Sequence, residues 1–205
     1  MAGAEPRPAA TVILVRGGGR HGGQGLEALM VRRSHGSRFM PGVWVFPGGA
    51  VGAEDRAQAE GAADPDEAAH LRCVRRELRE EAGIDLDAAA ELLPWSRWIT
   101  PEVVPVRFDT RFYLARAPAH ARPRPDGQEV VEALWIAPAA ALGRRGDGDF
   151  ELAFPTIKHL EGLSALATAD DAIAAARNRR VEPVLPRVVG TADDFRVVLP
   201  EDPDY

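Results

Sequence analysis

The chain has 205 residues, of which 31 are acidic and 25 are Lys or Arg, so its formal net charge is −6. This balance argues against non-specific binding of nucleic acid, and the longest apolar run, residues 9–15, is far below the roughly 18 residues that span a membrane. Cys73 is the only cysteine, which excludes an internal disulfide. The N-terminus lacks the basic-then-apolar layout of a signal peptide, so we expect a cytoplasmic protein.

A single domain is predicted over residues 10–205, after a loose segment at 1–9 and with a helical C-terminal extension from about residue 150. The glycine-rich connection 17–23 is predicted to be a hairpin turn, because it lacks the Gly-Lys-Ser/Thr ending of a phosphate-binding loop. Strands are predicted at 11–16, 26–32, 43–46, 91–99, 107–115 and 130–136, and helices at 64–83, 138–142 and across 154–176, the last broken near 167–170.

The helix predicted over 64–83 carries the strongest local signals. Asp64 suits the N-cap, Pro65 the first helical position and Gly83 the C-cap. At about 100° per residue, its acidic residues near the C-terminal end span roughly 100° of one face. These are Glu77, Glu80 and Glu81, and the apolar stripe beside them comprises Leu71, Val74, Leu78 and Ala82. The helix is therefore expected to pack on its apolar stripe while it presents three clustered anions.

The acidic cluster has two interpretations. A Glu-rich helix face is most often simply solvated. However, like charges four residues apart, as at Glu77 and Glu81, destabilise a helix by about 0.2–0.5 kcal/mol, so the clustering does not serve stability. The loop Phe46-Pro47-Gly48-Gly49 stands upstream and offers backbone carbonyls. Carboxylate and carbonyl oxygens together predict a site for a hard divalent cation, Mg²⁺ or Mn²⁺.

The segment 76–84 resembles the second half of the Nudix box, Arg-Glu-aliphatic-x-Glu-Glu-x-Gly-aliphatic, at every fixed position. Pro47-Gly48-Gly49 is similar to the Pro-Gly-Gly that opens this box. The resemblance extends from about residue 11 to residue 142. It implies an α/β fold, the α/β/α sandwich around a mixed β-sheet that is typical of Nudix proteins, to which this chain adds a helical C-terminal region.

The first half of the box departs from the family pattern. The usual box places its leading Gly 14 residues before the Arg, whereas Gly49 precedes Arg76 by 27 residues (76 − 49 = 27), which implies an insertion of about 13 residues. The Glu expected eight positions before Arg76 falls on Ala68. We therefore interpret residues 52–64 as a loop inserted before the helix, with the first carboxylate of the box missing or displaced.

The resemblance also implies roles for the clustered residues. Glu80 and Glu81 are expected to be metal ligands, and the Gly49 carbonyl a further ligand. Glu77 is expected to be either a ligand or the general base. Arg76 is expected to orient Glu77 or Glu80 through a charge-assisted hydrogen bond.

Further site residues are expected outside the helix. Nudix enzymes often recruit one more carboxylate from a distant loop, and Glu129 is the candidate, with Glu132 behind it; a plain surface role explains Glu129 equally well. Substrate phosphates would be bound by arginines, whose guanidinium group contacts phosphate bidentately. The candidates, each of which could instead be solvated, are Arg32, Arg33, Arg38, Arg107 and Arg111.

Three further features resemble the coenzyme A diphosphatase-like branch of the family: Phe39–Gly42 ahead of the Pro-Gly-Gly, the long insertion, and Arg107–Thr110. The main hypothesis is a Mg²⁺- or Mn²⁺-dependent hydrolase that cleaves the pyrophosphate linkage of a nucleoside diphosphate derivative. Coenzyme A or its thioesters is the first expected substrate, followed by ADP-ribose or a nucleotide sugar. The alternative is a regulatory module that senses nucleotides without cleaving them, for which the missing Glu is the motive. The expected partner is a small molecule, not nucleic acid or a membrane, and a homodimer would be common for this fold.

Overall fold

The computed structural model describes residues 4–17, 25–191 and 194–205. In this part of the chain, a mixed eight-stranded sheet has the strand order β3-β2-β1-β6-β5-β8, with β4 also paired to β1 and β7 to β2. The strands of the sheet are β1 (Arg7–Arg16), β2 (Glu27–Arg33), β3 (Trp44–Val45), β4 (Gly48–Ala50), β5 (Leu93–Ile99), β6 (Phe108–Arg116), β7 (Val130–Ile136) and β8 (Pro183–Val184). The helices are α1 (Ala53–Ala57), α2 (Pro65–Ala82), α3 (Pro138–Gly143), α4 (Phe154–Ser164) and α5 (Ala169–Arg177).

Strand β1 lies at the centre of the sheet, parallel to β6 and antiparallel to β2. Its apolar run is buried on both faces, as expected for a strand that is covered on two sides. Val12 and Leu14 contribute to one hydrophobic cluster, whereas Ile13 and Val15 contribute to the other. Each face of the sheet therefore has its own core.

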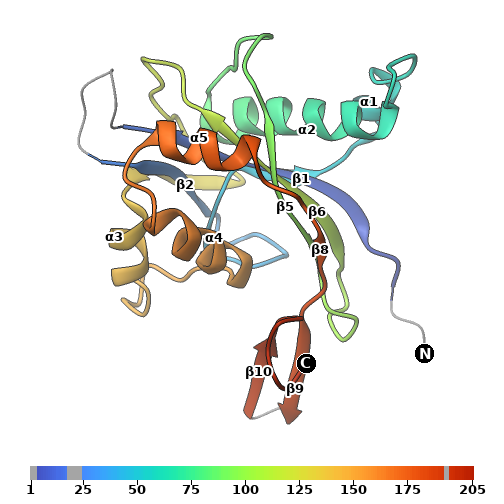
Figure 1. Cartoon of the computed structure of the whole chain (residues 1–205), viewed down its shortest axis with the longest axis vertical. Coiled ribbons are helices and arrows are strands. Elements are labelled where there is room, and N and C mark those ends of the chain that lie inside the picture. The colour runs from blue at the N-terminus through green and yellow to red at the C-terminus, as the bar shows by residue number, and fades with distance from the viewer. Residues whose placement is uncertain (1–3, 18–24, 192–193) are drawn as a thin grey trace.

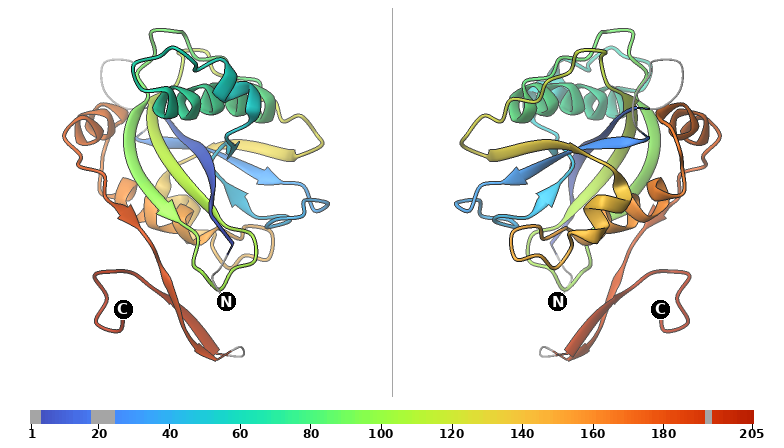
Figure 2. Two further views of the ribbon diagram at one scale, coloured as in Figure 1. Left: turned by 90° about the vertical axis from the view of Figure 1, so that its right-hand side faces the viewer. Right: turned by 90° about the vertical axis from the view of Figure 1, so that its left-hand side faces the viewer.

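Helix α2 covers one face of the sheet, and α3, α4 and α5 contribute to the core on the other (Figure 1 and Figure 2). The caps of α2 are as predicted: the Asp64 carboxylate accepts a hydrogen bond from the Glu67 N–H at 3.0 Å, and Pro65 occupies the first turn. Gly83 ends the helix at φ 62°, a left-handed conformation that favours glycine. The predicted sandwich with C-terminal helices is confirmed.

The structure corrects two of the predicted boundaries. The segment 52–64 is not only a loop, because it contains the short helix α1. The loose N-terminal segment is shorter than 1–9, because β1 begins at Arg7 and pairs there with Phe108. Most of the predicted hairpin turn at 17–23 lies outside the described residues.

The C-terminal tail adds the edge strand β8 and then a separate hairpin. The strands β9 (Arg187–Thr191) and β10 (Asp194–Val198) pair only with each other and extend away from the main body (Figure 1). Across the described parts of the chain, no helix combines the length and the apolar character that a bilayer crossing requires.

Candidate active site

The guanidinium group of Arg76 connects three carboxylates. Its Nη1 donates to Glu77 Oε1 at 2.8 Å and to Glu80 Oε2 at 2.9 Å. Its Nε and Nη2 donate to the two carboxylate oxygens of Asp55 at 3.2 and 3.0 Å. The hydrogen bonds to Asp55 make the largest contribution to raising the pKa of Arg76, so the group stays charged. Arg76 thus contacts both helix carboxylates that it was expected to orient.

Asp55 is the site residue that the sequence reasoning missed. It lies in α1 within the insertion and is almost fully buried. In the usual box the first Glu stands eight positions before the Arg and the Gly fourteen, so the Glu follows the Gly by six; Asp55 follows Gly49 by six (55 − 49 = 6). Counting forward from Gly49, instead of backward from Arg76, would have found it. The insertion therefore lies after the displaced carboxylate, and Ala68 is not its position.

The two glycines of β4 lie so close to their neighbours that no side chain would fit at either position. A Cβ on Gly49 would lie 2.3 Å from Glu77 Oε1, and a Cβ on Gly48 would lie 2.5 Å from the carbonyl oxygen of Ala10. Such close backbone approach is possible only for glycine. The Pro-Gly-Gly turn is therefore pressed directly against the helix carboxylates, as the sequence predicted.

The carboxylates of Glu77 and Glu81 lie where charge is costly. Burial raises the pKa of Glu81 to about 8, although the Gly48 N–H, which donates to Glu81 Oε2 at 2.9 Å, acts in the opposite direction. Burial also raises the pKa of Glu77, opposed by Arg76. A nearby cation would stabilise the ionised forms of these two carboxylates, which are buried and repel each other.

The donor chemistry of these residues fits a divalent cation. In the described part of the chain, no group of three or more His, Cys, Asp or Glu side chains is arranged to hold a metal ion. The available donors are nevertheless all hard oxygens, which Mg²⁺ and Mn²⁺ prefer. They are the carboxylates of Glu77, Glu80 and Glu81 and the carbonyl of Gly49.

The structure brings Glu129 and Arg33 to the cluster. The charge of Glu129 contributes to raising the pKa of both Glu77 and Glu81, and the charge of Arg33 contributes to lowering that of Glu81. Both are placed by the pairing of β2 with β7: the Ser34 N–H donates to the Glu129 carbonyl at 2.8 Å. Glu129 therefore stands beside the cluster from a distant part of the sequence.

Of the other arginines near this end of β2, Arg32 is already engaged. It donates to Glu132 at 2.7 Å and to the Gly42 carbonyl at 3.3 Å, and its Nη2 lies 3.2 Å from His35 Nε2. Glu132 is accordingly a partner of Arg32. Arg38 lies on the loop 34–42, and its guanidinium forms no hydrogen bond with any residue that the structure describes.

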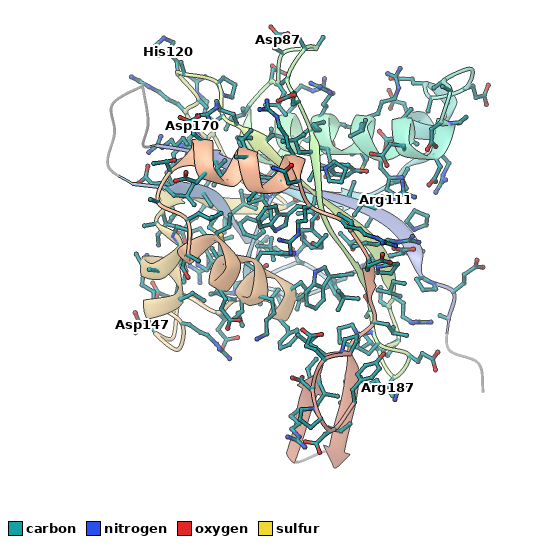
Figure 3. The ribbon with its side chains drawn as sticks, in the orientation of Figure 1. Asp87, Arg111, His120, Asp147, Asp170 and Arg187 are labelled. Carbon is teal, nitrogen blue, oxygen red and sulfur yellow. The ribbon has the colours of Figure 1, made fainter. Side chains whose placement is uncertain are left out.

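Arg107 and Arg111 do not lie at the cluster, which corrects their expected place at the site. Arg111, labelled in Figure 3, pairs with Glu67 at 2.7 Å and with Asp66, two acids in the first turn of α2. Ten residues of helix, roughly 15 Å, separate that turn from Glu77. The guanidinium of Arg107 is buried and donates to two backbone carbonyls at 3.0 and 2.8 Å. Both arginines therefore stabilise the fold through contacts within the protein.

Comparison with known proteins agrees with this geometry. A model of the NUDIX domain matches residues 5–154. The chain belongs to the Nudix family. It is 28% identical to the acyl-coenzyme A diphosphatase NUDT19 of Gallus gallus, over 97% of this chain and 79% of that protein. It is 26% identical to the putative nudix hydrolase 7 of Caenorhabditis elegans, over 70% of this chain and 58% of that protein.

Among solved structures, the fold is similar to that of a NUDIX hydrolase from Alicyclobacillus acidocaldarius, with a TM-score of 0.72 and 29% identity, over 87% of this chain and 99% of that one. The predicted family and fold are therefore confirmed, and the chain is a Nudix hydrolase of the diphosphatase type. Nudix hydrolases typically use a divalent metal and act on nucleotide-type small molecules.

Proposed function

We propose that this Nudix hydrolase cleaves the pyrophosphate linkage of nucleoside diphosphate derivatives with Mg²⁺ or Mn²⁺, and that coenzyme A or its thioesters is the first substrate to test. The observation that carries the proposal is the shared hydrogen-bonding of Glu77 and Glu80 by Arg76, next to Glu81 and the two close-packed glycines. This arrangement gathers acidic oxygens that could bind a divalent cation, and the cation would supply the positive charge that a pyrophosphate substrate needs.

The metal would be held by Glu77, Glu80, Glu81 and the Gly49 carbonyl. When bound, the ion supplies positive charge that offsets the negative charge of both phosphates and makes water more acidic. Arg76 fixes the orientation of two of these carboxylates through the hydrogen bonds described above. Most of the catalytic effect would be electrostatic positioning, because phosphoryl-type transfer needs little covalent help.

Glu129 is the better candidate for the general base. The carboxylate of Glu77 is buried and bonded to Arg76, so it is suited to a fixed role at the metal. Glu129 is exposed, and its carboxylate forms no hydrogen bond with any described residue, so it is free to accept a proton from the attacking water. Its charge contributes to raising the pKa of both Glu77 and Glu81, which supports this role.

Two arginines are candidates for the substrate phosphates. Arg33 lies near Glu81, and its Nε donates to the Phe39 carbonyl at 3.0 Å, which shapes the loop 34–42. Arg38 stands on that loop with its guanidinium uncommitted to any described residue. The likeness to an acyl-coenzyme A diphosphatase supports coenzyme A thioesters ahead of ADP-ribose or nucleotide sugars.

The alternative function, a module that senses nucleotides without cleaving them, is no longer supported by the observation on which it rested. That alternative rested on the absence of the first carboxylate of the box, but Asp55 supplies a carboxylate to Arg76. The set that orients the helix carboxylates is therefore complete in this chain.

The test is an incubation of the protein with coenzyme A, acetyl- and longer acyl-coenzyme A, ADP-ribose and UDP-glucose, with and without Mg²⁺, read by mass spectrometry. Coenzyme A should give 4′-phosphopantetheine and adenosine 3′,5′-bisphosphate, with ¹⁸O from labelled water in one of the two. Glu80→Gln is the control, because Glu80 is half exposed and its loss leaves the core intact. Turnover by the wild type no greater than that of Glu80→Gln for every compound would reject the proposal.

A further inference from the structure

The segment that carries Glu129 is docked on the end of α2. The Arg124 N–H donates to the carbonyl oxygen of Ala82, the last residue of the helix, at 2.7 Å. A Cβ on Gly83 would lie 3.3 Å from the Cβ of Arg124, so the glycine also makes room for this contact. The connection between β6 and β7 is thereby fixed close to the carboxylate cluster, five residues before Glu129 (129 − 124 = 5).

Between this contact and β7, the Asp126 carboxylate organises the backbone. Oδ1 accepts from the N–H groups of Gln128 at 3.2 Å and Val130 at 2.8 Å, and Oδ2 accepts from the N–H of Glu129 at 3.1 Å. The Gly127 N–H closes the turn on the Val130 carbonyl at 2.9 Å, with Gly127 at φ 76°. Three consecutive amides thus converge on one side chain.

This turn determines where Glu129 points. Val130, which follows it, is fully buried and is the first residue of β7. The carboxylate of Glu129 itself is held by no hydrogen bond within the described parts of the chain, so its position depends on its backbone. A change in the turn would therefore move the carboxylate relative to Glu77 and Glu81.

We propose that Asp126 is a positioning residue that holds Glu129 at the carboxylate cluster through these three backbone hydrogen bonds. The inference rests on the proposed function, in which Glu129 is the general base. Asp126 remains ionised at neutral pH: burial raises its pKa, but the N–H groups of Val130, Glu129 and Gln128 together outweigh burial and hold the pKa below its usual range. A charged acceptor forms stronger hydrogen bonds than a neutral one.

The kinetic test is a double-mutant cycle of Asp126→Ala and Glu129→Gln. Glu129→Gln should lower kcat about 100-fold, within the range for loss of a general base. Asp126→Ala should lower kcat about tenfold with KM changed less than twofold, and should have no further effect when Glu129 is already Gln. Asp126→Asn, which keeps one acceptor oxygen, should restore part of the loss. Equal losses of kcat from Asp126→Ala in both backgrounds would overturn the inference, because a merely structural role is independent of Glu129.

A second measurement needs no substrate. Amide hydrogen exchange at Gln128, Glu129 and Val130 should quicken in Asp126→Ala, while the amides of α2 keep their protection. Unchanged exchange at these three amides would overturn the inference even in an active enzyme. The two proposals fail in distinguishable ways: a wild type without metal-dependent turnover rejects the proposed function, whereas an active wild type with additive losses rejects only the role of Asp126.

Discussion

Asp55 in the short helix α1 and Arg76 in α2 form a bidentate ion pair, with Nε–Oδ1 and Nη2–Oδ2 distances of 3.2 and 3.0 Å. The same guanidinium holds Glu77 and Glu80. Asp55, which lies outside α2, therefore fixes the guanidinium group that orients two carboxylates of the candidate metal site. The insertion in the box lengthens the connection after Asp55 without breaking this contact.

We predict that Asp55→Ala lowers kcat about 10–100-fold, the range seen when a residue supporting a metal site is lost. Without Asp55, the guanidinium of Arg76 loses its fixed position and no longer holds the helix carboxylates in one orientation. Steady-state kinetics and thermal unfolding would measure the effect on activity and folding separately. Asp85→Asn, at an exposed position just past the helix, is the matched control and should leave kcat unchanged. Wild-type kcat in Asp55→Ala would contradict the role given to this ion pair.

Gly49→Ala should abolish most of the activity, by 100-fold or more, because its methyl group would lie 2.3 Å from Glu77 Oε1 and force the carboxylate aside. The comparison is Gly162→Ala in α4, where an added Cβ meets nothing within 4 Å. This control should keep full activity and raise the stability by about 1 kcal/mol, the helix propensity difference between alanine and glycine. Similar activity in the two variants would show that the close approach of Gly49 to Glu77 is unimportant.

The Cys73 thiol should not react with alkylating reagents in the native protein at pH 8. It is fully buried beneath the turn, with Sγ 3.5 Å from the carbonyl oxygens of Gly49 and Ala50. Burial, together with the charges of Glu77 and Asp55, raises its pKa to about 12. Mass spectrometry after iodoacetamide treatment should show no adduct until denaturant is added. Rapid labelling of the folded protein would mean that the turn opens readily.

His159 should make the protein less stable as the pH falls below about 6.5. It is buried among aromatic rings, its Nε2 lies 2.6 Å from Ser96 Oγ, and burial lowers its pKa to about 3. The unfolded chain therefore takes up a proton between pH 6.5 and 3 that the folded protein does not, and stability is lost in that window. Between pH 6.5 and 5 the loss from this residue should be about 1.6 kcal/mol, because the slope rises from half of 1.36 kcal/mol per pH unit at pH 6.5 toward the full value at pH 5.

The check for His159 is urea unfolding of the wild type and of His159→Gln at both pH values. Gln does not titrate, so the variant should lose about 1.6 kcal/mol less than the wild type over this interval. An identical pH dependence in the two proteins would show that the histidine is charged in the folded state.

Most of the fold follows from local sequence signals. The bounds of α2 follow from Asp64, Pro65 and Gly83, each of which acts on its own backbone neighbourhood. The strand at 130–136 was predicted with the observed bounds, because its apolar run is enclosed by turn residues. The predicted clustering of Pro-Gly-Gly with the helix carboxylates is likewise confirmed in the structure by the contacts of Gly48 and Gly49.

The rest could not be obtained from local patterns, because it depends on pairing between distant segments. Arginine is a residue type that commonly binds phosphate, but the partners of Arg111 and Arg107 are carboxylates and backbone carbonyls that only the folded chain brings near them. Asp55 is found only by counting forward from Gly49, because counting backward from Arg76 crosses the insertion and leads to Ala68. Asp126 acts on backbone amides, and its importance depends on the place of Glu129 in three dimensions.

The most direct test of the metal site is a crystal structure of the active enzyme soaked with Mn²⁺, with the ion located by its anomalous scattering. The account predicts a peak within about 2–2.5 Å of carboxylate oxygens from Glu80 and Glu81 and of the Gly49 carbonyl. Mn²⁺ bound elsewhere and absent from these oxygens, in a protein that cleaves its substrate, would contradict it.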